Sequence, residues 1–177
     1  PAEPYEPLTV IGRKAYLTPL IINVRGHDML ISNGSAICQA FSPATGDEIW
    51  RVIDGAESTI SMPITEKGIV YWYSGYMVAD DGSKYTNLLA VNPDGKGDIT
   101  NTNILWKKRH TLLQNQMLTP VIKEGLIYTV TTKNQLICVD ASTGEEVWSN
   151  KVPVNYNASP LFINGNIWLF SVNGDVV

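Results

Sequence analysis

Short apolar runs separated by turn residues repeat along the whole chain. Between residues 118 and 151, for example, apolar runs are separated by turns at Lys123–Gly125 and Thr143–Gly144. Runs of about five residues with Gly-containing turns between them are typical of an up-and-down antiparallel sheet. No segment keeps the 3.6-residue period of an amphipathic helix over a helical length. The pattern therefore predicts an all-β chain made of four-stranded antiparallel units.

One marker of a repeat is a small residue followed by Thr-Gly and then by Trp. Residues 40–50 and 138–148 share the same spacing, and residues 90–106 form a stretched copy with an insertion. Gly suits the tight turn because it adopts positive φ without strain, and each Trp offers a large surface to a neighbouring sheet. We predict a structural docking motif formed by Ala40, Gly46, Trp50, Ala90, Trp106, Cys138, Gly144 and Trp148.

A second marker precedes each copy of the first. It is a Pro that enters an apolar run, followed by a Gly-containing turn; the prolines are Pro19, Pro63, Pro120 and Pro160. Two markers in one phase indicate a real repeat of about 40–50 residues, the size of a four-stranded propeller blade. We expect blades at about 14–56, 57–112 and 113–153, and an incomplete fourth blade at 154–177, within one partial propeller domain that spans 1–177.

The pattern Ala-x-Asp-x-x-Thr-Gly-x-x-x-Trp resembles the tryptophan-docking motif of pyrroloquinoline-quinone (PQQ)-type β-propeller repeats. Residues 88–100 also look like those of bacterial secreted members of this family. The resemblance implies a ring of seven or eight blades, of which about three and a half are present. We expect a fragment whose remaining blades come from a missing segment; a ring closed by a second copy is the alternative.

Composition and charge narrow the classes of partner. The chain contains 17 Ile, 15 Val and 14 Thr against 10 Ala, which favours β-structure. The formal net charge is −4 and there is no long basic run, so we expect no nucleic-acid partner. No apolar stretch approaches the ~20 residues of a membrane span. Cys38 and Cys138 are far apart in sequence, and we expect both to be buried free thiols.

Candidate catalytic chemistry is sparse. His27 and His110 have no Cys, His or carboxylate at metal-ligand spacing, so we interpret both as surface loop residues. We assign no catalytic, cofactor-binding or metal-binding residue. The PQQ enzymes that the chain resembles need a calcium site and often a vicinal cysteine pair, which this sequence does not show.

Blade two carries the two longest loops. One contains Tyr76 and Tyr85, and the other is the insertion that contains Asp94 and Asp98. Long loops on a rigid scaffold are common binding sites, so we predict contact with a protein or small ligand there.

The resulting hypothesis is a non-catalytic binding scaffold in the periplasm or outer cell envelope of a bacterium, a location implied by resemblance alone. One alternative is a PQQ-dependent alcohol or sugar dehydrogenase, with PQQ and calcium, whose catalytic site lies outside this segment. Another is a cytoplasmic interaction propeller.

Overall fold

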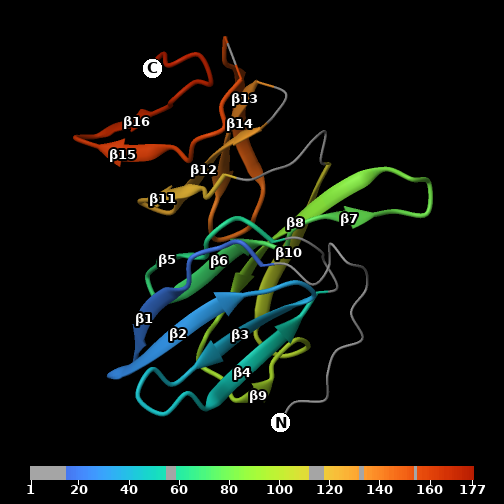
Figure 1. The fold of residues 1–177 in the computed structure, drawn as a ribbon, viewed down its shortest axis with the longest axis vertical. Helices are drawn as coiled ribbons and strands as arrows, with labels where there is room; N and C mark the ends of the chain where they lie inside the picture. Colours follow the sequence, from blue (N-terminus) through green and yellow to red (C-terminus); the bar gives the residue numbers. More distant parts are fainter. Residues whose placement is uncertain (1–14, 55–58, 112–117, 132–133, 154) are drawn as a thin grey trace.

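The computed structural model describes residues 15–54, 59–111, 118–131, 134–153 and 155–177, and within them the chain is all-β. Its antiparallel sheets follow one another in chain order along the long axis of the view (Figure 1). These sheets are the blades of a partial β-propeller. The predicted blade junctions at 56–57 and 112–113, and residues 14 and 154, lie outside the described residues.

Blade one has four antiparallel strands in sequence order, and a fifth strand from blade two extends it. Its own strands are β1 (Leu20–Val24), β2 (His27–Asn33), β3 (Ile37–Phe41) and β4 (Glu48–Ile53). The fifth strand, β9 (Gly97–Asp98), pairs with β4 in parallel, Trp50 opposite Gly97 and Arg51 opposite Asp98.

Blade two has the strand order β5–β6–β8–β10, and the short strand β7 pairs with an extension of β8. The strands are β5 (Ile64–Glu66), β6 (Ile69–Tyr73), β7 (Met77–Val78), β8 (Lys84–Val91) and β10 (Ile104–Thr111). Because β8 is longer than β6, the β7–β8 hairpin extends away from the other sheets (Figure 1).

Blade three is a regular four-stranded sheet, and blade four contributes one described hairpin. Blade three consists of β11 (Val121–Lys123), β12 (Leu126–Thr131), β13 (Gln135–Asp140) and β14 (Glu146–Lys151); blade four has β15 (Leu161–Ile163) and β16 (Asn166–Trp168). In all four blades the first hairpin turns through two residues of positive φ, the second of which is Gly. This geometry matches the right-handed twist of the paired strands.

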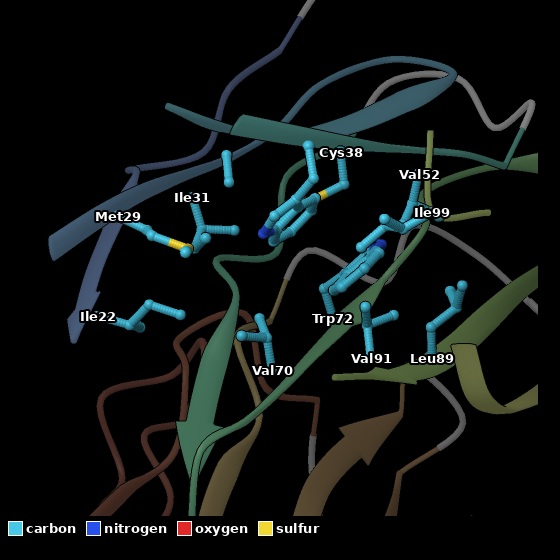
Figure 2. Packing of buried hydrophobic residues seen from close by; sticks show 12 residues of the cluster. Ile22, Met29, Ile31, Cys38, Val52, Val70, Trp72, Leu89, Val91 and Ile99 are labelled. Carbon is cyan, nitrogen blue, oxygen red and sulfur yellow. The ribbon is translucent and has the colours of Figure 1, made fainter. Parts of the chain in front are cut away.

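The core lies in the seams between blades, because successive residues of a strand point to opposite faces of its sheet. On blade two, Val70, Trp72, Leu89 and Val91 face blade one, whereas Tyr71, Tyr73, Leu88 and Ala90 face blade three. Figure 2 shows the first seam, where Trp72 points toward Cys38 and Val52 of blade one. Trp72 is 1% exposed and packs in this seam.

Hydrogen bonds also join neighbouring blades just before their first strands. The amide of Met62 donates to Oγ1 of Thr119 (3.0 Å), and the amide of Thr119 donates to Oγ of Ser159 (3.0 Å). Met62, Thr119 and Ser159 all directly precede the prolines of the second sequence marker. The residues before Pro63 and Pro120 therefore link blade two to blade three and blade three to blade four.

Two lysines of β10 connect blade two to both neighbours. Lys107 pairs with Asp54 of blade one, whose side chain is 6% exposed, and Lys108 pairs with Glu145 of blade three. A carboxylate this buried depends on its counter-charge, because burial of an unpaired charge is costly.

We predict that Lys107→Gln lowers the free energy of unfolding by about 1–3 kcal/mol, since it leaves the buried Asp54 carboxylate without its cation. Urea denaturation followed by tryptophan fluorescence measures the effect. The control is Lys151→Gln, at an exposed position of β14, which should change stability by no more than about 0.5 kcal/mol. Equal effects of the two substitutions would contradict a stabilising role for the Lys107–Asp54 pair.

Candidate functional site: the docking motif and the rim of blade two

The structure places the small residue of each motif directly opposite its Trp on the neighbouring strand. Ala40 pairs with Trp50, Ala90 with Trp106 and Cys138 with Trp148. Each pairing is followed by a register shift, so the residue before the Trp bulges out of the ladder. The stretched copy thus reproduces the geometry of the other two despite its insertion.

Trp106 shows how one blade docks on the next. Its Nε1 donates to the carbonyl oxygen of Ala141 in blade three at 3.0 Å. Gly144 lies under the indole: a Cβ at this position would come within 2.7 Å of Trp106 Cε3 and of Lys108 Cγ. The absence of a side chain at Gly144 is therefore what permits this close packing, in addition to its positive φ of 74°.

The three Trp residues differ in burial. Trp50 is fully buried in the seam between blades one and two. Trp148 is 37% exposed, and its ring lies 6.2 Å from that of Tyr128, centroid to centroid. Blade four packs on blade three through a cluster that contains Val130 and Tyr156 but not Trp148.

Both cysteines are free and buried, as predicted, one in β3 and one in β13. Burial raises the pKa of the Cys38 thiol, and the nearby Asp54 carboxylate raises it further. Burial also raises the pKa of Cys138. Thiols held in the protonated form are poor nucleophiles, so neither residue is a reactive centre.

The insertion of blade two is anchored on blade one. It contributes β9, and Ile99, which is 2% exposed, enters the first seam. Asp94 pairs with Arg25 of blade one. The Asp98 carboxylate accepts a hydrogen bond from the amide of Thr100 (2.9 Å), and bonds from Thr100 lower the pKa of Asp98. A binding role for Asp94 and Asp98 stays a prediction.

The β7–β8 hairpin presents aromatic and cationic side chains together. Arg109 of β10 lies over the ring of Tyr85, with Cζ 3.8 Å from the centroid, and Lys84 Nζ lies 5.4 Å from the centroid of Tyr76. The tip contains Asp81, whose pKa is lowered by hydrogen bonds from Ser83. Cation–π contacts hold exposed rings and cations in fixed orientations. The structure thus brings Tyr76 and Tyr85 onto one projecting hairpin.

The two histidines lie in different settings. His27 is exposed at the start of β2, directly after the first turn. The prediction that His110 lies in a surface loop is wrong: it belongs to β10, where it pairs with Thr86 of β8. The strand continues past the basic residues because β8 is equally long and pairs with it throughout. The His110 ring contacts that of Tyr73 edge-on, with centroids 5.8 Å apart.

Among the described residues, no three His, Cys, Asp or Glu side chains converge on one point. An open hollow of about 620 Å³ lies on blade one, between the β1–β2 turn and residues 42–44, with Lys96 at its edge. None of the predicted binding residues lines it.

Across the described ranges, the structure also has no helix with the length and apolar character that a membrane crossing needs.

A protein-family model described as outer membrane protein assembly factor BamB matches residues 33–177. The chain belongs to the BamB family. A curated relative, the outer membrane protein assembly factor BamB of Kangiella koreensis, is 26% identical over 115 residues, which cover 63% of this chain and 26% of the relative. The chain thus spans about a quarter of the length of that relative.

Solved structures agree on the fold. The quinohemoprotein alcohol dehydrogenase of Comamonas testosteroni superposes with a TM-score of 0.56 at 12% identity, covering 85% of this BamB-family chain and 33% of the enzyme. The computationally designed Ika4 protein gives 0.55 at 12% identity, covering 89% and 86% of the two chains. At such low identity these similarities concern the fold alone.

Sequence reasoning missed β9, the β10 position of His110 and the Thr/Ser-Pro links between blades. The links had a visible signal, since Thr or Ser precedes three of the four marker prolines. The parallel pairing of β9 had no such signal, because it occurs once and joins segments far apart in the chain.

Gly144→Ala and Gly46→Ala form a matched pair that isolates the docking contact. Both glycines have positive φ (74° and 77°), but a Cβ at Gly46 would meet nothing within 4 Å. We expect both substitutions to destabilise the fold, Gly144→Ala by about 1–3 kcal/mol more, because only it forces Trp106 out of place. Chemical denaturation measures the difference, and equal losses would show that the Trp–Gly contact adds nothing.

The burial of the His110 imidazole predicts that the stability of the fold depends on pH. Burial lowers its pKa from 6.5, partly opposed by the Glu146 carboxylate. The unfolded chain therefore binds the proton more tightly, and stability should fall as pH drops below about 6.5 and level off below the folded-state pKa. His110→Gln should show a smaller loss of urea midpoint between pH 7.5 and 5.5. His27→Gln controls for loss of a histidine, and a wild-type slope in His110→Gln would contradict the prediction.

Proposed function

We propose that this chain forms part of a non-catalytic protein-interaction scaffold in a bacterial cell envelope. Family membership supports the proposal, because both the matching model and the Kangiella relative are described as outer membrane protein assembly factors. Location in the periplasm or at the outer membrane is part of the same proposal.

The observation that carries the interaction role is the projecting β7–β8 hairpin. Both faces of blade two are covered, one by blade one and the other by blade three. The hairpin extends beyond this packing, Val78 is 56% exposed, and the Tyr85–Arg109 and Tyr76–Lys84 pairs lie at its base. Tyr and Arg are enriched among residues that dominate protein–protein affinity. The partner surface that we assign includes both faces of the hairpin, with Tyr76, Val78 and Lys84 on one face and Tyr85 and Arg109 on the other.

Site-specific photo-crosslinking in bacterial cells tests the proposal. A photoreactive phenylalanine analogue at Val78 should give a discrete adduct with an envelope protein. The matched control is the same analogue at Leu105, which is similarly exposed (55%) on β10 but outside the hairpin. No discrete adduct at Val78, or the same adduct from Leu105, would contradict the assigned surface.

Replacing both Tyr76 and Tyr85 by Ala should reduce the Val78 adduct at least about fivefold, because the aromatic anchors of the surface are lost. The melting curve of the double variant must remain cooperative, which separates loss of contact from loss of fold. Adduct formation that survives the double substitution would show that the tyrosines do not bind the partner.

A further inference from the structure

Five polar side chains point into the seam between blades two and three, at the end of the blades away from the Thr-Gly turn. They come from four strands of two facing sheets: Tyr73 of β6, Thr86 of β8, His110 of β10, and Thr129 and Thr131 of β12. Each shares its face with a residue of the apolar cluster in this seam, such as Leu88 for Thr86 and Ile127 for Thr129. These five polar side chains therefore continue the core of the seam.

The polar atoms of all five are buried. Oγ1 of Thr86, Oγ1 of Thr131 and Nε2 of His110 have no hydrogen-bond partner, and the hydroxyls of Tyr73 and Thr129 have only each other. Tyr73, Thr86 and Thr129 are only 2%, 1% and 0% exposed. Buried hydroxyls without partners are rare in native proteins because each one costs stability. Several in one seam point to a polar guest shared among them.

Three observations show that these groups adjoin one another. Thr86 and His110 are directly paired across β8 and β10. The Tyr73 and His110 rings meet edge-on at an interplanar angle of 81°. Burial raises the pKa of Tyr73 to about 12, and a hydrogen bond with the Thr129 hydroxyl, from the facing blade, opposes that rise. The tyrosine therefore lies next to polar groups on both sides of the seam.

We propose that this seam binds a water-sized polar guest that bridges the hydroxyls of Tyr73, Thr86 and Thr129 and the Nε2 of His110. Hydroxyl groups both donate and accept, so the same site suits a water molecule or a small monovalent anion such as chloride. The charged groups nearby are Glu146 of β14, which acts on His110, and Lys108 of β10, which is paired with Glu145. The guest joins blade two to blade three where the apolar packing ends.

Replacing a buried Thr by Val gives opposite signs for the two possibilities. If Thr86 binds a guest, Thr86→Val removes a hydrogen bond and lowers Tm by about 2–4 °C. If its hydroxyl has no partner, the methyl group that replaces it is better suited to the site, and Tm stays unchanged or rises.

Thr59→Val is the matched reference for loss of a satisfied buried hydroxyl. Thr59 is also 0% exposed, and its Oγ1 lies 3.0 Å from the carbonyl oxygen of Gly34 and 3.1 Å from that of Ser74. A loss in Thr86→Val comparable with that in Thr59→Val supports the guest. An unchanged or higher Tm in Thr86→Val overturns it.

A crystal structure of the protein from bromide-containing solution distinguishes the two guests. A density peak within hydrogen-bond distance of at least two of the three hydroxyls supports the site in either case. An anomalous bromide signal at that peak identifies a small anion, and its absence there identifies water. A seam without a peak, in which the hydroxyls turn toward each other, overturns the proposal. This site lies apart from the β7–β8 hairpin, so its failure leaves the proposed partner surface untouched.

Discussion

The close approach of an outer-strand indole to a glycine of the next blade is the contact on which the other features of this fold depend. At Gly144 there is no room for even one additional carbon atom beside Trp106. The indole also donates to a backbone carbonyl of the blade it contacts, so that its polar end is satisfied as its apolar face is buried. Docking therefore fixes the distance between sheets, and the seam residues pack at that distance.

Much of this geometry is local and could be predicted from the sequence. In the two unstretched copies the small residue and its Trp belong to adjacent strands joined by one tight turn, so their spacing along the chain determines that they face each other. Asp140 caps its turn by accepting from the amides of Ser142 and Thr143, both within three residues. Contacts between distant segments could not be predicted this way. The parallel pairing of Gly97 with Trp50 has no counterpart in the other described blades, and no sequence pattern within either segment indicates it.

His110 illustrates a second limit of the sequence. It stands beside Lys107, Lys108 and Arg109, and a basic run is typical of a solvated segment. In a strand, however, alternate residues face opposite sides, and Lys108 and His110 share the face of Trp106. Lys108 reaches Glu145 at the edge of the seam, whereas the shorter imidazole stays inside beside Tyr73. The composition of the run is typical of a solvent-exposed segment, but the period-two geometry of β10 turns Lys108 and His110 toward the seam.

The same alternation limits where a partner can bind. The buried apolar residues of β6 and β8 pack in one seam or the other. Altering them for binding would therefore disturb the contact with a neighbouring blade. Among the described residues of blade two, only the segments that extend beyond this packing, the β7–β8 hairpin and the insertion, are free from this constraint. The insertion is itself bound to blade one through β9 and Ile99. The hairpin is thus the part of blade two where aromatic side chains can be presented to a partner without weakening the docking of the blades.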